Sequence, residues 1–168
     1  MSETGLPDRV RRAFADHGSF EPASDDGVWT SETTAFDGRV RAEPTEDGRV
    51  RFAVTVRVPT LSAATADEVA EVVEEGWIET FELRVVDVGG VTRVDREFDP
   101  SVAVDDDELV VEFGLTDSNE RRGVDDAGAL IDFVEGTYVQ GVIPGYEYVD
   151  PVAGLLSAAR RHGNDGGR

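Results

Sequence analysis

The clearest pattern along the chain is a strict alternation of apolar and polar positions over residues 49–58. The apolar positions are Val50, Phe52, Val54, Val56 and Val58. Because successive side chains of a strand point to opposite faces, the pattern predicts a β-strand with one buried and one solvated face. Shorter strand-like runs at residues 28–36 and 39–43 precede it, with turn residues at 37–38 and 44–48 between the runs. We therefore expect an antiparallel meander.

Apolar residues recur at three- and four-residue steps in four other segments, which predicts four helices. The expected helices cover residues 6–17, about 65 to Gly89, 119–138 and 151–161. In the second of these helices the stripe comprises Val69, Val72, Val73, Gly76, Trp77, Thr80, Phe81, Arg84 and Val85. This broad stripe predicts one long helix that faces the core along its whole length.

Two further strands are expected at residues 91–98 and 109–115, with an acidic run at 105–108 between them. The fold class is therefore α+β, in the order α-β-β-β-α-β-β-α with a terminal helix appended, and helices pack on an antiparallel sheet. We assign residues 1–161 to a single domain and expect residues 162–168 to form a disordered tail.

Charge changes the picture of where the protein works. The chain has 168 residues, with 36 acidic against 16 basic residues, a net charge of −20, and all its basic residues are arginine. Concentrated salt suits such a surface, because at about 1 M the Debye length falls to about 3 Å. The composition resembles that of cytoplasmic proteins of salt-in haloarchaea. With no secretory pattern and no apolar run long enough to span a membrane, we expect a halophilic, soluble, cytoplasmic protein.

Several chemistries are excluded or disfavoured by residues that the chain lacks. Without cysteine there are no disulfides or thiolate sites, and without lysine there is no ordinary P-loop and no Schiff base. The two histidines, His17 and His162, are expected at a helix end and in the tail. The acidic runs lack the spacing of a cation loop and are interpreted as solvated loops. We therefore expect no catalytic, cofactor-binding or metal-binding residues, and the negative charge makes nucleic acid an unlikely partner.

Four arginines are expected to share one face of the sheet. They are Arg39, Arg41, Arg49 and Arg51. Such a row can bind an anion or an RNA backbone, or it can pair with interleaved carboxylates such as Glu32 and Glu43. Phe52 falls on the opposite face, so the row has no aromatic platform for bases.

A tyrosine-rich segment at residues 138–149 is the feature that a plain core explains least. Glycine and proline interrupt its apolar residues, so it cannot be a regular helix. It either covers the core or forms a groove that meets another chain, because tyrosine combines apolar area with a polar tip. The candidate partner-binding residues are Tyr138, Val142, Ile143, Tyr146 and Tyr148. Trp29 and Trp77 are expected in the core.

Two runs carry a resemblance to a known family. Gly-Trp-Ile-Glu-Thr-Phe-Glu-Leu-Arg at residues 76–84 and Gly-Thr-Tyr-Val-Gln-Gly-Val-Ile-Pro-Gly-Tyr-Glu-Tyr at 136–148 resemble an uncharacterised, haloarchaea-restricted family of about this length. The resemblance implies no activity and no site residues. Separately, the element order resembles that of type III secretion chaperones, which are non-enzymatic, often dimeric and bind partner peptides. That likeness implies a protein partner and a homodimer.

These observations leave three hypotheses. The first is a non-enzymatic protein-binding or chaperone-like module, and the alternative is a small carboxylate-dependent, cation-assisted hydrolase. An RNA-binding sheet is the third. An enzyme predicts a deep pocket with converging carboxylates, whereas a binding module predicts an open groove or an apolar patch.

Overall fold

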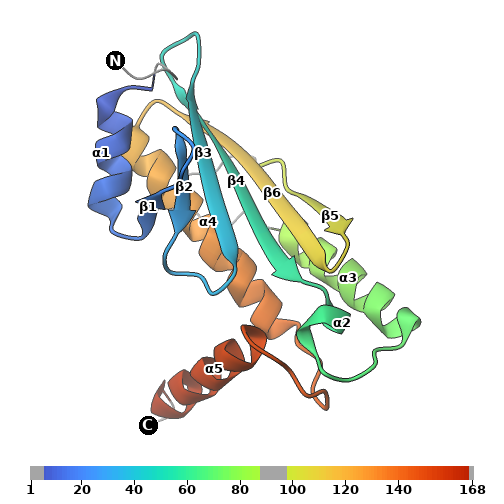
Figure 1. Cartoon of the computed structure of the whole chain (residues 1–168). Coiled ribbons are helices and arrows are strands. Elements are labelled where there is room, and N and C mark those ends of the chain that lie inside the picture. The colour runs from blue at the N-terminus through green and yellow to red at the C-terminus, as the bar shows by residue number, and fades with distance from the viewer. Residues whose placement is uncertain (1–5, 88–97, 167–168) are drawn as a thin grey trace.

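A computed structural model of the chain describes residues 6–87 and 98–166. Over these residues six antiparallel strands form one sheet in the order β1-β2-β3-β4-β6-β5 (Figure 1). The strands are β1 (Phe20–Pro22), β2 (Val28–Ser31), β3 (Asp37–Pro44), β4 (Val50–Pro59), β5 (Ser101–Asp105) and β6 (Glu108–Asp117). The helices are α1 (Asp8–His17), α2 (Leu61–Ala64), α3 (Glu71–Val86), α4 (Glu120–Gln140) and α5 (Val152–Gly166). The chain is thus a single α+β domain with helices packed on an antiparallel sheet, as predicted.

The predicted meander is confirmed, and its alternation sets the two faces of the sheet. Val54 of β4 lies opposite Val40 of β3 on one side and opposite Phe113 of β6 on the other. All three side chains are buried. Arg51 and its alternate neighbours point to the other face, so the period of two fixes which residues reach the core.

The first strands differ from the prediction at residues 28–36. β2 ends at Ser31 because the following loop is tied to a helix: Thr34 Oγ1 and the Ala35 amide both donate hydrogen bonds to Glu135 Oε1, over 3.2 and 3.1 Å. β1 was not predicted from the sequence. It lies at the edge of the sheet, where Pro22 is tolerated because one side of the strand needs no partner.

α4 crosses one face of the sheet, with α1 and α3 beside it, and no helix of the described chain covers the opposite face (Figure 1). The apolar face of α4 agrees with the prediction, because Val124, Ala127, Ile131, Val134 and Tyr138 are all buried. Its first turns come very close to β4. A Cβ atom at Gly123 would lie 2.2 Å from Cε2 of Phe52, so only glycine allows this approach.

The single long helix expected from residue 65 is wrong. Instead α2 ends at Ala64, and α3 begins at Glu71 after an extended connection. The Thr60 side chain accepts a hydrogen bond from the Ala63 amide and so caps α2 separately. The buried stripe of α3 is also narrower than predicted: Trp77, Phe81 and Val85 are buried, whereas Val72 is 75% exposed.

Both tryptophans lie in the core, as expected. Trp29 stacks on Phe14 of α1 with ring centroids 3.9 Å apart, and Trp77 meets Tyr138 edge to face at 5.4 Å. The two aromatic pairs fix α1 and α3 against opposite ends of α4 and the sheet. Aromatic contacts of this kind add to the gain from burial alone.

The acidic run lies between two strands, as predicted, whereas the helix at the C-terminus is longer than predicted. Residues 105–108 join β5 to β6 in a tight hairpin, while the strand predicted at 91–98 lies outside the described residues apart from Phe98. α5 continues to Gly166, past the expected helix end at residue 161, so residues 162–166 are helical.

Candidate functional site

The tyrosine-rich segment continues from the end of α4 and is hydrogen-bonded to the connection between α2 and α3. The Ala66 amide donates a hydrogen bond to the Glu147 carbonyl oxygen, and the Val149 amide donates one to the Ala64 carbonyl oxygen, both over 2.8 Å. The Glu147 amide donates to the Asp67 carboxylate over 2.6 Å. We call residues 141–149 the tyrosine loop; these bonds give it a defined path although it is neither helix nor regular strand.

Within the tyrosine loop, two aromatic rings support each other. Tyr146 and Tyr148 meet edge to face at 6.5 Å, and the Tyr148 hydroxyl donates a hydrogen bond to the Ile143 carbonyl oxygen. Burial raises the pKa of Tyr148, the hydrogen bond to Ile143 partly opposes this, and Tyr146 acts in the same direction as burial. Gly145, with a φ of 100°, makes the turn between these parts.

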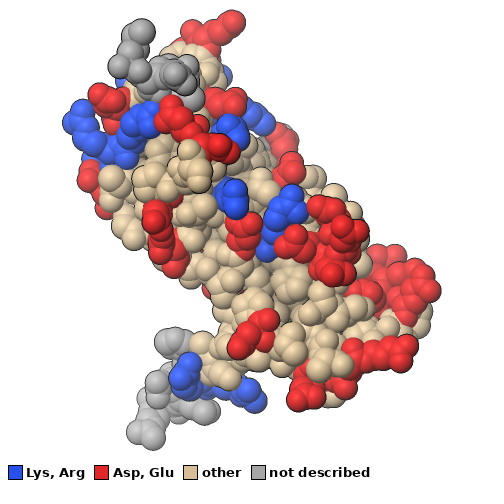
Figure 2. Space-filling view, viewed as in Figure 1, with Lys and Arg blue, Asp and Glu red and all other residues tan. Residues whose placement is uncertain are grey.

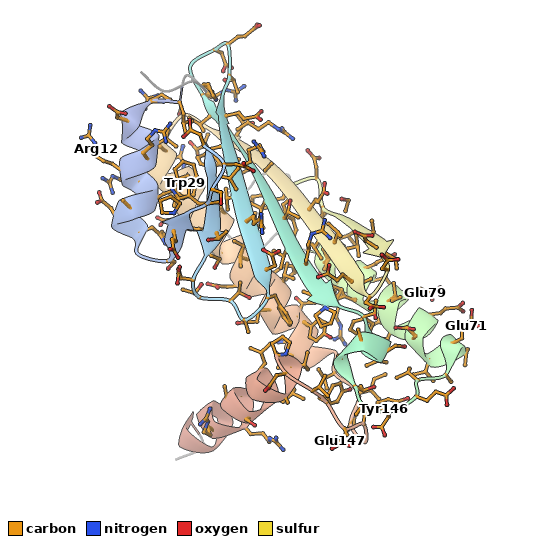
Figure 3. All side chains as sticks on the ribbon, in the orientation of Figure 1. Arg12, Trp29, Glu71, Glu79, Tyr146 and Glu147 are labelled. Atoms are coloured by element: carbon orange, nitrogen blue, oxygen red, sulfur yellow. The ribbon has the colours of Figure 1, made fainter. Side chains whose placement is uncertain are left out.

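A groove lies between the tyrosine loop and α5 and has a volume of about 630 Å³. Its lining residues are mostly apolar or small: Val139, Val142, Pro144, Gly145, Tyr146, Tyr148, Ala153, Leu156, Ser157, Ala159 and Arg160. Among these lining residues Arg160 alone is charged. Figure 3 shows Tyr146 and Glu147 on the loop and α5 across from them. The volume falls in the range that accommodates a small ligand or several side chains of a peptide.

The structure places the five predicted partner-binding residues in two different environments. Val142, Tyr146 and Tyr148 line the groove, and Ile143 is half-buried beside them. Tyr138 lies near the C-terminal end of α4. Its side chain is only 1% exposed and packs among aromatic side chains. It therefore belongs to the core, in the part of α4 from which the tyrosine loop starts.

The opposite wall of the groove was not anticipated from the sequence. It is one face of α5, which carries Ala153, Leu156, Ser157 and Arg160 at steps of three, one and three residues. The helical spacing of these residues could have been recognised in the sequence. The sequence around them does not indicate that this face of α5 meets a loop rather than the sheet. Only the contact between α5 and the end of α4 decides it.

Two of the four arginines in the row on the uncovered sheet face pair with carboxylates, although not with the two carboxylates suggested from the sequence. Arg39 bonds Asp37 over 3.0 Å, and Arg49 bonds Asp47 over 2.8 Å. Arg51 lies across Gly114, where a Cβ atom would come 2.9 Å from its guanidinium nitrogen. Phe52 is buried on the other face, as predicted. Two of the four cations of this row are thus neutralised, and Phe52 on the other face offers the row no ring for base stacking.

His17 and the carboxylates near it lie on α1 and α4, outside the residues that line the groove. His17 Nε2 lies 3.2 Å from Asp125 Oδ1 at the contact of α1 with α4. Burial raises the pKa of Asp132 on α4, and Glu135 acts in the same direction. Within residues 6–87 and 98–166, no group of three or more His, Asp and Glu side chains is placed to hold a metal ion.

The comparison with known families gives one match, which spans residues 15–158: a family of unknown function (DUF5813). The chain belongs to this family. The match runs from the end of α1 into α5 and so includes the tyrosine loop and most of the groove. No curated protein and no solved structure matches the chain. In the described part of the chain, no helix combines the length and the apolar character that a membrane span requires.

Proposed function

We propose that this protein is a non-enzymatic protein-binding module, chaperone-like in that it takes an apolar helical segment of a protein partner into the groove. The observation that carries the proposal is the groove itself, open to solvent between the tyrosine loop and α5. Tyrosine, leucine and valine side chains supply its apolar area, and tyrosine is among the residues that carry most of the binding energy at protein interfaces.

The lining also indicates the chemistry of the partner. Arg160 is the single cation at the groove, so a carboxylate near one end of the bound segment would pair with it. Small side chains at Ala153, Ser157 and Ala159 leave room for the backbone of a helix to approach α5 closely. The expected ligand is therefore an apolar helix with an acidic end.

Support for the hydrolase alternative is lacking in the described residues. Hydrolysis assisted by a cation needs several carboxylates around one cavity, whereas the groove lining contains none. The carboxyl with a raised pKa, Asp132, lies on α4 and not among the residues that line the groove. We therefore retain the protein-binding function alone.

The setting that we propose for this function is the salt-rich cytoplasm of a halophile. It is supported by the charge of −20 and by the use of arginine, and never lysine, as the basic residue. In molar salt, charge repulsion between partners is screened within a few ångströms, so the apolar groove would dominate recognition.

The test is a selection of peptides against the intact protein in molar KCl. A display library of helix-forming peptides about 15 residues long provides candidates that are able to form an isolated helix. Peptides that are enriched should bind the wild-type protein in a fluorescence anisotropy titration, and Tyr146→Ala should weaken binding about tenfold. Leu83→Ala is the matched control, because it removes a side chain that is 70% exposed on α3, outside the groove.

Two results would overturn the proposal. One is a selection that enriches no peptide above a column without protein although the chain sediments as a monomer, so that no second copy occupies the groove. The other is a set of peptides whose affinity falls with Leu83→Ala but not with Tyr146→Ala, since these would bind elsewhere on the surface.

A further inference from the structure

Most of α5 lies outside the packed core of the fold. It projects from the end of α4 away from the sheet (Figure 1). Val152 in its first turn is buried and Leu155 and Leu156 are partly buried, while Ser157, Arg160 and Arg161 are exposed. A helix of this length is marginal in water without packing, so the groove-facing side of α5 favours a partner that covers it.

The groove-facing side of α5 is suited to a second helix. Ala153, Leu156, Ser157 and Arg160 form one stripe, with Leu156 as the largest apolar side chain near its middle. Small neighbours on both sides of a leucine allow the leucine of an opposing helix to fit beside it. An identical stripe on a second chain would fit when the two helices run antiparallel, which is the arrangement produced by a two-fold axis perpendicular to the helices.

Charges along this part of the chain are also self-complementary in the antiparallel arrangement. Glu147 and Asp150 precede α5 at its N-terminal end, and Arg160 and Arg161 lie towards its C-terminal end. Figure 2 shows blue arginine atoms on α5, whereas red carboxylate atoms dominate the α2–α3 side of the same end of the molecule. Two antiparallel copies would place each basic end beside the acidic end of the other, with the helix dipoles opposed.

We propose that α5 of a second copy of this chain fills the groove, so that the protein is a two-fold homodimer with the two α5 helices packed against each other. This inference rests on the proposed function and names the partner of the same site. Because each α5 is both a wall of its own groove and the segment that enters the other, both grooves are filled by one contact.

The other exposed apolar surface is less suited to a second copy. Val72, Leu83 and Val86 are exposed on α3. Glu71 and Glu79 project from the same helix, as Figure 3 shows. Two copies of α3 would bring like charges together, which is destabilising, whereas two copies of α5 bring opposite charges together.

The first experiment compares two substitutions at one exposed position in the middle of the stripe. Sedimentation equilibrium of the full chain in molar KCl should give twice the mass of one chain for the wild type. Ser157→Trp places a bulky ring where the two helices meet and should convert the dimer into a monomer with an unchanged circular-dichroism spectrum. Ser157→Ala, which keeps the side chain small, should stay dimeric.

The second experiment tests the charge pairing at the lowest salt concentration at which the protein stays folded. Arg160→Glu should raise the dissociation constant of the dimer about three- to tenfold. Adding Glu147→Arg should recover part of that loss, because the pairing is restored with its signs exchanged. Arg12→Glu makes the same change of charge on α1, far from the groove, and should leave the constant unchanged (Figure 3).

The outcomes separate this inference from the proposed function. A chain that stays monomeric but binds selected peptides in the groove overturns the dimer and supports the function. A dimer whose mass is unaffected by Ser157→Trp overturns the placement of the second copy. A monomer that binds no peptide overturns both.

Discussion

The hydroxyl group of Tyr138, near the end of α4, donates a hydrogen bond to the carbonyl oxygen of Pro59, at the end of β4, over 2.9 Å. The bond joins the base of the tyrosine loop to the sheet, and the ring packs edge to face against Trp77. Burial raises the pKa of Tyr138, which keeps the hydroxyl protonated and able to donate at any physiological pH. The groove is therefore built on a rigid end of α4.

Replacing Tyr138 with Phe should leave the Pro59 carbonyl oxygen without this donor. We expect the free energy of unfolding to fall by about 0.5–1.5 kcal/mol, measured by denaturant titration. Tyr146→Phe is the control, since no hydrogen bond from the Tyr146 hydroxyl to any described residue is found. Equal losses in the two variants would contradict the role assigned to the Tyr138 bond.

Gly123→Ala should be strongly destabilising, because the new methyl group would overlap the ring of Phe52. We expect a loss of about 1–3 kcal/mol, as for other overpacked cores, seen as a lower melting temperature. Gly136→Ala on the same helix is the matched control: it has open space around the new Cβ atom and should be neutral or stabilising. If both variants melt at the wild-type temperature, α4 does not approach β4 as described.

Asp132→Asn should stabilise the protein near neutral pH. Asp132 lies at the surface, but its partial burial raises the pKa of the carboxyl, Glu135 raises it further, and His17 partly opposes them. The folded state therefore holds this proton more tightly than the unfolded chain does, so ionisation reduces stability as the pH rises above the ordinary pKa of an aspartate. The melting temperature of the variant should exceed that of the wild type at about pH 7, and the gap should close towards about pH 3.

The control for Asp132→Asn is a variant that removes a carboxylate from a different helix. Glu79→Gln on α3 should change the melting temperature little at either pH, because its side chain is exposed. A gap for Asp132→Asn that stays the same at both values of pH would mean that the burial of this carboxyl is not what sets the difference.

Dialysis from about 2 M KCl into about 0.1 M KCl should unfold the protein or expand it. The net charge of −20 repels itself once the Debye length grows to about 10 Å. Far-ultraviolet circular dichroism and sedimentation velocity would follow the change. Restoring KCl should reverse the change fully, whereas adding sucrose without KCl should reverse it only in part. A spectrum and a sedimentation coefficient unaffected by dialysis would remove the main support for a salt-rich setting.

Local periodicity explains why parts of the fold could be predicted from the sequence. The alternation from Val50 to Val58 and the stripe from Val124 to Tyr138 each depend on neighbours two to four positions away. One edge of the sheet and the α2–α3 connection were predicted wrongly. There, a distant partner such as Glu135 or a cap at Thr60 decides where an element ends.

Of the candidate residues named from the sequence, Val142, Tyr146 and Tyr148 line the groove, but the geometry of the groove could not be predicted. Glu147 and Asp67 are joined although they lie 80 positions apart, and Arg160 comes opposite Tyr146 only because α5 leaves α4 in that direction. By itself, the sequence determined the charge, the periodic strands and helices, and the absence of cysteine and lysine chemistry. Only the tertiary structure decided that Tyr138 is core and that α5 walls a groove, because those facts depend on contacts between segments that no local pattern relates.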